Sequence, residues 1–279
     1  MNTNMGSKNK LSYRIFSLIV LVVLAVLFSF PLYWILTGSL KDAAAINAAK
    51  PQWLPTAPTF DNYVRLFKNP AFKWLYNSVF ISVVAMGLTC VTASMAGYVL
   101  AKKRFYGRTF LFSLLVCAMA LPKQVILIPL LKEMAFLKLH DNIWAVILPT
   151  VGWPFGVFLM KQFSENIPTE MLEAARIDGA GELRTFTGIV LPMIKPGIGA
   201  LAIFTFITSW NDYFMQLIML NSKANLTISL GIAKLQSEMS TDFGLIMAGA
   251  ALAAVPIVAI FLLFQKYFTQ GITMGAVKG

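Results

Sequence analysis

Four long runs of this 279-residue chain contain no Asp, Glu, Lys or Arg, and they limit its possible folds more than any other feature. They cover residues 15–40, 74–101, 142–160 and 243–265. A helix rises about 1.5 Å per residue, so each run can cross a hydrocarbon core of about 30 Å. The composition agrees, since 58% of the residues are hydrophobic and 13% are charged, which is typical of membrane proteins. The sequence therefore predicts an all-α integral membrane protein.

Two further stretches are almost as apolar and complete a set of about six spans. Residues 109–131 are interrupted only by Lys123, and residues 196–222 only by Asp212. We count them as the third and fifth spans. The expected organisation is one transmembrane domain over residues 15–270, with a short N-terminal segment at 1–14 and a tail at 271–279.

The basic residues predict the orientation of these spans. Two groups of basic residues are dense, whereas the basic residues of the loop 41–73 are spread over its whole length. Dense basic segments next to a span favour the cytoplasmic side, so both termini are expected to be cytoplasmic. The two dense groups are Lys102, Lys103, Arg104 and Arg108 after the second span, and Lys8, Lys10 and Arg14 before the first.

The polar segment at residues 161–195, between the fourth and fifth spans, carries the most specific pattern in the chain. Pro168 suits the start of a helix, and Glu170 and Glu173 suit its positive end. Gly179 and Gly181 give the backbone the freedom to reverse. The pattern predicts a cytoplasmic helical hairpin, which by itself could also be a surface feature with no partner.

The spacing of this segment resembles the EAA motif of ABC-importer permeases at every position. Residues 173–179 read Glu-Ala-Ala-Arg-Ile-Asp-Gly, and after nine residues Ile-Val-Leu-Pro follows at 189–192. The resemblance implies the MetI-like permease fold, with a helix-turn-helix that docks on an ATPase subunit and transmits its motion to the membrane. The residues that match the ATPase-coupling part of the motif are Glu173, Ala174, Ala175, Arg176, Asp178 and Gly179.

Other stretches are similar to the carbohydrate-uptake subfamily, in particular to the second, smaller permease of maltose-type transporters. They include Asn62-Tyr63, residues 76–78, 101–108 and 128–130, and Trp210-Asn211-Asp212. In that subfamily the C-terminal tail reaches between the ATPase subunits, although this chain has Ala276 where the family often has Gly. The segment after Leu137 also departs from the family pattern. The matching tail residues are Gly275, Ala276, Val277, Lys278 and Gly279.

The resemblance also implies a set of partners. We expect a second homologous permease, two cytoplasmic ATPase subunits that hold ATP and Mg, an extracytoplasmic solute-binding protein and a sugar substrate. The assembled transporter would lie in the inner membrane of a bacterial or archaeal cell. The net charge of +11 is then explained by contact with anionic lipid headgroups and an acidic partner rather than nucleic acid.

Ionisable residues within a span usually face a cavity or a partner, which singles out Lys123 and Asp212 as candidates for the substrate path. Trp210, Asn211 and Asp212 together could offer a sugar ring stacking and hydrogen bonds. The bland alternatives are that Asp212 caps a helix or reaches water near the outer surface, and that the third span ends at Lys123. From the resemblance, Tyr76 and Asn77 join the candidates.

Other functional classes have weaker support in the sequence. A secondary transporter or channel would ordinarily show internal repeats and several ionisable groups at mid-membrane, which we do not find. A membrane-embedded enzyme would need paired carboxylates or a nucleophile arrangement that is also missing. No Gly-Lys pair is present for a phosphate-binding loop, and His140 is the only histidine, so we expect no catalysis, no cofactor and no metal site in this chain.

Overall fold

The computed structural model describes the backbone of residues 5–238 and 242–276, and the side chains of residues 13–236 and 242–265. All regular secondary structure in these residues is helical. Two compact units can be distinguished. The first contains residues 1–69 and 234–252, and the second contains residues 70–233 and 253–279.

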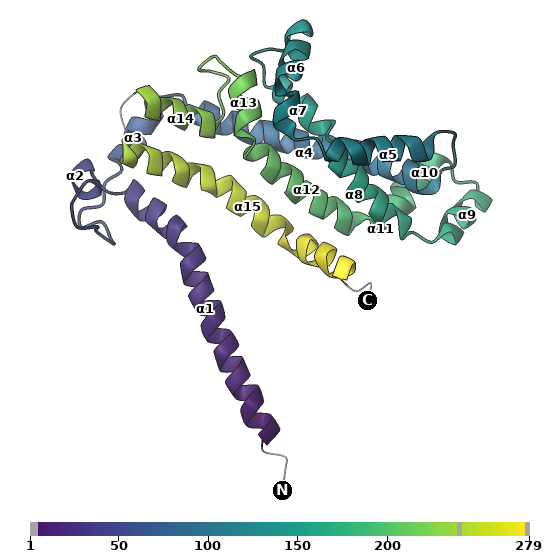
Figure 1. Ribbon diagram of the computed structural model, residues 1–279, viewed down its shortest axis with the longest axis horizontal. Helices are drawn as coiled ribbons and strands as arrows, with labels where there is room; N and C mark the ends of the chain where they lie inside the picture. The colour runs from purple at the N-terminus through teal and green to yellow at the C-terminus, as the bar shows by residue number, and fades with distance from the viewer. Residues whose placement is uncertain (1–4, 239–241, 277–279) are drawn as a thin grey trace. The chain divides into compact units, whose positions relative to one another are not determined.

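The helices carry the labels of Figure 1. In chain order they are α1 (Met5–Ser39), α2 (Ala43–Ile46), α3 (Asp61–Phe67), α4 (Ala71–Lys102), α5 (Arg108–Met119), α6 (Lys123–Phe136), α7 (Trp144–Val151), α8 (Pro154–Glu165), α9 (Thr169–Ile177), α10 (Glu182–Thr185), the π-helix η1 (Phe186–Val190), α11 (Leu191–Met193), α12 (Lys195–Trp210), α13 (Tyr213–Met219), α14 (Ile228–Glu238) and α15 (Phe243–Ala276).

Four segments in the described part of the chain are long and apolar enough to cross a membrane, and they match the four charge-free runs. They are Tyr13–Ser39, Ala71–Lys102, Trp144–Glu165 and Phe243–Gln265. Two bent helix pairs have the same character, and counting each as one span gives up to six, although the second pair begins within the segment 161–195 and overlaps the predicted fifth span only at residues 196–210. These pairs are Arg108–Met119 with Lys123–Phe136, bent by 106°, and Glu182–Met193 with Lys195–Trp210, bent by 77°.

The third and fifth predicted spans are therefore not single straight helices. The third breaks at residues 120–122, because Pro122 cannot donate a backbone hydrogen bond and disfavours a helical conformation at the residue before it. The fifth ends at Trp210, and a new helix, α13, begins after Asp212. The alternative that the third span ends at Lys123 describes the first break correctly.

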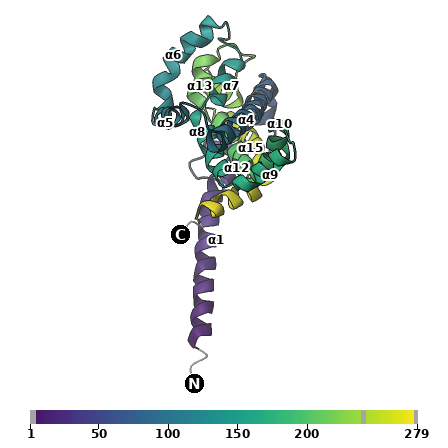
Figure 2. The same cartoon turned by 90° about the vertical axis from the view of Figure 1, so that its right-hand side faces the viewer.

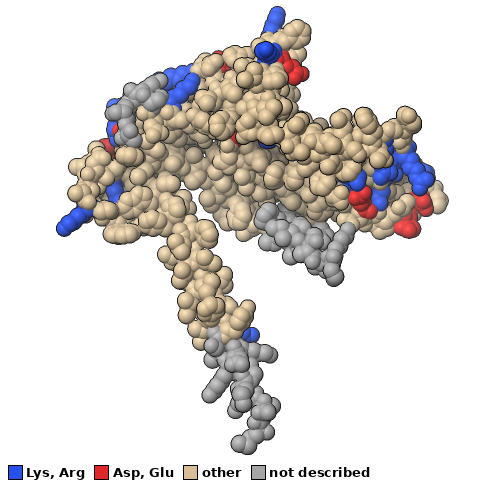
Figure 3. Space-filling view, viewed as in Figure 1, with Lys and Arg blue, Asp and Glu red and all other residues tan. Residues whose placement is uncertain are grey.

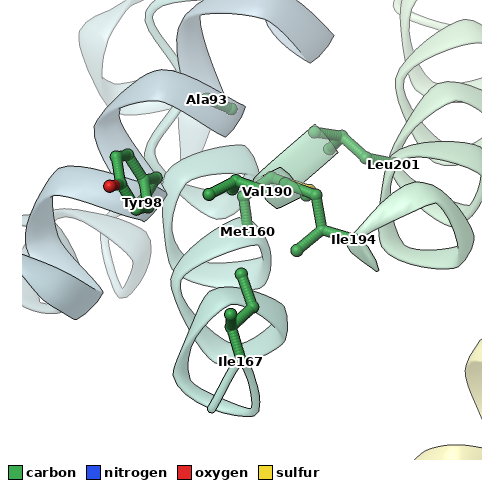
Figure 4. Close-up of a cluster of buried hydrophobic side chains, with 7 residues drawn as sticks. All are labelled: Ala93, Tyr98, Met160, Ile167, Val190, Ile194 and Leu201. Atoms are coloured by element: carbon green, nitrogen blue, oxygen red, sulfur yellow. The ribbon is translucent and has the colours of Figure 1, made fainter. Parts of the chain in front are cut away.

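The second unit is built around α4, which packs against α8, α12 and α7. Helices α4, α8 and α12 run side by side in Figures 1 and 2. Small residues allow the close approach. A Cβ atom added at Gly97 would lie 2.6 Å from the backbone nitrogen of Lys161, and one at Gly156 would lie 3.1 Å from the Cβ of Ala93. Figure 4 shows the buried apolar cluster at this contact, formed by Ala93, Tyr98, Met160, Ile167, Val190, Ile194 and Leu201.

The first unit is held together by polar contacts of Asn62. Its buried amide donates to the carbonyl oxygens of Ser39, at 2.9 Å, and Lys41, at 2.8 Å. Arg65 donates to the Asn62 Oδ1 at 2.6 Å and forms an ion pair with Asp242. By contrast, the apolar side chains of α1 within the described residues are largely exposed in this chain. Such a continuous apolar surface requires lipid or another helix to cover it.

Candidate functional site

The coupling segment, residues 161–195, forms the predicted helical hairpin. Its first helix, α9, begins at Thr169, so Pro168 stands one residue before the helix instead of at its first position. The chain reverses at Gly179, whose φ of +75° lies in the left-handed region that favours glycine. Gly181 has an ordinary φ of −69° and directly precedes α10. Of the two glycines, only Gly179 is required by the backbone.

The predicted coupling residues lie together on this hairpin. Ala175 is buried and supports the turn, since its carbonyl oxygen accepts a hydrogen bond from the Ala180 N–H at 2.9 Å. The other five are exposed. A groove of about 420 Å³ follows the same surface and is lined by Met171, Ala174, Ala175, Asp178, Ala180, Arg184, Thr185, Gly188 and Ile189.

Two exposed apolar residues of the coupling segment, neither of which lines this groove, were not among the predicted site residues. Ile177 is 86% exposed and Leu183 is 71% exposed, although both side chains are apolar. A sequence signal was available, because each is flanked on both sides by charged residues: Ile177 by Arg176 and Asp178, and Leu183 by Glu182 and Arg184. Exposed large apolar side chains are typical of a surface that binds another protein.

The basic loop after α4 contacts the coupling segment directly. Lys102 Nζ donates to the backbone oxygens of Glu165, at 3.1 Å, and Ile167, at 2.6 Å. Lys103 Nζ donates to Glu182 Oε1 at 2.6 Å. Burial alone would lower the pKa of Lys103, but its hydrogen bond with Glu182 raises the pKa above its ordinary value. Figure 3 shows the resulting cluster of basic and acidic side chains at the end of this unit that contains α9 and α10.

A second candidate site is a cavity of about 140 Å³ within the helices of the second unit. Lys123 lines it, and the Lys123 Nζ lies 3.7 Å from Asp212 Oδ2 and 4.7 Å from the centre of the Trp153 ring. The two ionisable residues found in the predicted spans therefore form one ion pair. The cavity is lined by Thr89, Lys123, Thr150, Trp153, Phe155, Gly156, Leu201, Phe204, Thr205 and Thr208.

Asp212 has a second role at the same place. Its Oδ1 accepts a hydrogen bond from the Met215 N–H at 3.3 Å and so caps the first turn of α13. This agrees with the alternative that Asp212 is a local cap. Trp153 was not predicted as a site residue, although its position between Gly152 and Pro154 marks a break in the fourth span, where a side chain can enter a cavity.

Trp210 and Asn211, the sequence neighbours of Asp212, do not line this cavity. Trp210 is 3% exposed and stacks on Phe206, with ring centres 5.6 Å apart. The Asn211 side-chain amide donates to the Ile207 carbonyl at 3.0 Å. In this structure the Trp210 ring is therefore packing material and is not available to stack on a sugar.

Tyr76 and Asn77 also lie elsewhere. Asn77 is buried, and its amide donates to the carbonyl oxygens of Ala224 and Leu226, both at 2.9 Å, which fixes the chain before α14. Tyr76 is exposed and stacks on Phe80 at 5.9 Å. Of the six predicted path residues, the structure brings only Lys123 and Asp212 together.

The predicted ATPase-contacting tail is only partly covered by the structure. The backbone of Gly275 and Ala276 ends α15. Val277, Lys278 and Gly279 lie outside the described residues.

The segment after Leu137, where the sequence departs from the family pattern, forms a clasp around Asp141. Asp141 has a φ of +56°, and its Oδ1 accepts hydrogen bonds from the N–H groups of Asn221, at 2.8 Å, and Ser222, at 3.0 Å. The Asn225 amide donates to the Asp141 carbonyl at 2.5 Å. Burial would raise the pKa of Asp141, but these hydrogen bonds lower it to about 2.

This clasp predicts a defined pH dependence. Because the folded-state pKa of Asp141 is below its ordinary value, its contribution to stability is complete above about pH 4 and is lost as the pH falls towards 2. Asp141→Ala should lower the free energy of unfolding at pH 7 by about 1 kcal/mol, since water can replace part of the lost acceptor. Thermal unfolding in detergent from pH 7 to pH 2 measures both effects. An identical pH profile for the wild type and Asp141→Ala would contradict this role.

The comparison with known proteins agrees with this arrangement. Residues 93–274 match the family described as binding-protein-dependent transport system inner membrane component. The arabinooligosaccharides transport system permease protein AraQ of Bacillus subtilis (strain 168) is 36% identical over 271 residues, which cover 96% of each chain. The trehalose transport system permease protein SugB of Mycobacterium tuberculosis (strain CDC 1551 / Oshkosh) is 32% identical over 254 residues, 89% of this chain and 92% of that protein.

A solved structure shows the same fold. It belongs to a bacterial ABC transporter involved in the import of the acidic polysaccharide alginate, and one of its chains aligns with 93% of this chain and 98% of its own length, at a TM-score of 0.82 and 21% identity. The predicted resemblance is thus confirmed over nearly the whole chain. This multi-pass membrane protein belongs to the family of binding-protein-dependent transport system inner membrane components, the permease subunits of ABC importers.

Proposed function

We propose that this chain is one of the two permease subunits of an importer for a sugar or oligosaccharide and forms half of its translocation path. The observation that carries the proposal is the extended similarity to sugar-transport permeases over 89–96% of the chain. The sugars named for these relatives differ from that of the structural neighbour: arabinooligosaccharides and trehalose are neutral, whereas alginate is acidic.

The coupling segment is the proposed docking element for an ATPase subunit. Its exposed Ile177 and Leu183 can enter apolar depressions of a partner, and the small Ala174 lets a partner approach the α9 backbone closely. Glu173, Arg176 and Asp178 would supply charged contacts around this apolar centre. ATP and Mg²⁺ would be bound by the two ATPase subunits, so this chain would transmit motion and catalyse no reaction itself.

The contacts between the basic loop and the coupling segment support a cytoplasmic position for both. Lys102 and Lys103 bond to Glu165, Ile167 and Glu182, which requires the two segments to lie on the same side of the membrane. The basic loop favours the cytoplasm by its charge, and the coupling segment would need to be there to meet an ATPase. With six spans, both termini would also be cytoplasmic.

The remaining surfaces suit the other expected partners. The exposed apolar face of α1 would be covered by lipid or by the second permease, and an extracytoplasmic binding protein would deliver the sugar to the outer side. The cavity at Lys123 would be the part of the path that this subunit contributes. The tail at residues 275–279 would contact the ATPase subunits.

Purification of the assembled transporter tests this proposal. This chain should co-purify with one second permease and two ATPase subunits, and ATP hydrolysis by the complex should increase when the binding protein is added with its sugar. A chain that assembles without ATPase subunits, or that transports a sugar in their absence, would contradict the proposal.

A further inference from the structure

Among the residues that the structure describes, those lining the cavity that contains Lys123 are neutral apart from this one cation. A lone ammonium in a largely apolar surrounding attracts an anion. Here Asp212 supplies the counter-charge, since its Oδ2 lies 3.7 Å from the Lys123 Nζ. The pair has no net charge, so an anionic solute gains no free cation in this cavity.

The position of this counter-charge is fixed by the fold. The Asp212 side chain is only 17% exposed, whereas that of Lys123 is 35% exposed. Asp212 is held by the hydrogen bond that caps α13, and the Lys123 ammonium is also placed over the Trp153 ring. Both partners are therefore oriented by other contacts, so they can remain paired while a solute passes.

The rest of the cavity suits hydroxyl groups and sugar rings. Thr89 is 3% exposed, and its hydroxyl has no hydrogen-bond partner in the described part of the chain. The hydroxyls of Thr150 and Thr208 donate to backbone oxygens at 2.8 Å, which leaves their own oxygens free to accept. Phe155 and Trp153 add aromatic surface of the kind on which the apolar faces of a sugar ring can stack.

We propose that Lys123 and Asp212 form a neutralised pair that makes this path selective for uncharged saccharides and against uronic-acid or other anionic sugars. The proposal rests on the proposed function of the chain as a sugar permease, and it assigns the charge class of the substrate. Asp212 is the residue that determines this selectivity, because it cancels the only charge that the described residues place in the lining of the cavity.

A double-mutant cycle tests whether the two charges act as a unit. Lys123→Gln and Asp212→Asn each leave one charge unpaired, and uptake of the neutral sugar recognised by the binding protein should fall roughly tenfold in each. Asn is as good a helix cap as Asp, so Asp212→Asn retains the start of α13. The double variant Lys123→Gln/Asp212→Asn should recover to within about threefold of the wild type. A double variant as poor as the worse single one would overturn the proposal.

Direct binding of an anionic probe to the purified transporter gives a readout that does not depend on transport. Galacturonate should bind Asp212→Asn roughly tenfold more tightly than the wild type, and this gain should disappear in the double variant. Equal affinity for galacturonate in the wild type, Asp212→Asn and the double variant would overturn the proposal that Asp212 neutralises Lys123. If instead the wild-type complex imports no sugar while the galacturonate result holds, the proposed function fails and with it the substrate assignment, and only the mutual neutralisation of Lys123 and Asp212 stands.

Discussion

Replacing Gly179 by Pro is expected to reduce sugar uptake roughly a hundredfold while the protein still inserts into the membrane. The φ of Gly179 is +75°, and proline fixes φ near −65°. Proline also removes the N–H that donates to the Arg176 carbonyl at 3.1 Å. A misfit of about 3 kcal/mol would depopulate the turn roughly a hundredfold, and with it the hairpin that we expect to transmit the motion of the ATPase.

Two further variants control this experiment. Gly181→Ala should transport normally, because Gly181 has an ordinary φ and no atom lies within 4 Å of an added Cβ. Glu173→Lys leaves the backbone of the turn unchanged and reverses one exposed charge in the middle of α9, so it tests the docking surface alone. Sugar uptake and complex yield should be measured together. Wild-type uptake in Gly179→Pro would mean that this turn has no part in coupling.

The second large effect is expected at the contact between α4 and α8. A Cβ atom at Gly97 would lie 2.6 Å from the Lys161 nitrogen and 2.7 Å from the Met160 carbonyl carbon, and these backbone atoms cannot move without separating the helices. Gly97→Ala should therefore lower the free energy of unfolding by about 1 to 3 kcal/mol. The melting temperature in detergent should fall by about 2 to 4 °C for each kcal/mol.

Gly87 provides a matched control on the same helix. No atom lies within 4 Å of a Cβ added there, and alanine favours a helix over glycine by up to about 1 kcal/mol. Gly87→Ala should therefore melt at the same temperature as the wild type or slightly higher. Equal melting temperatures for Gly97→Ala and Gly87→Ala would show that the α4–α8 contact is not limited by the size of residue 97.

Four of the membrane spans and the coupling hairpin could be predicted from the sequence because both depend on local patterns. A charge-free run of 20 or more residues has few alternatives to a membrane helix, and the left-handed turn needs a glycine at a fixed distance from the preceding helix. The break after Trp210 was missed and the break at residues 120–122 was anticipated only as an alternative, because counting charges does not detect where a backbone bends. Pro122 was the available signal for the first break.

The sequence predicted the two charged residues at the cavity but not that they pair with each other. Lys123 and Asp212 stood out individually, since each is the one charged residue in an apolar stretch, but their pairing links positions far apart in the chain and depends on how α6 and α13 pack. The grouping of Trp210 with Asp212 was misleading, because neighbouring residues at the end of a helix face different surroundings. Trp210 is buried against Phe206, and the aromatic ring beside Lys123 is that of Trp153.

The most direct test is sugar accumulation in sealed vesicles that contain the reconstituted transporter, with ATP on the ATPase side and the loaded binding protein on the other. The account predicts that wild-type vesicles accumulate a neutral sugar only when ATP and all four membrane and ATPase subunits are present. Vesicles with Gly179→Pro should contain the same complex but accumulate sugar roughly a hundredfold more slowly. Accumulation at the wild-type rate in Gly179→Pro vesicles, or in vesicles without the ATPase subunits, would contradict the assignment of this chain as a coupled permease subunit.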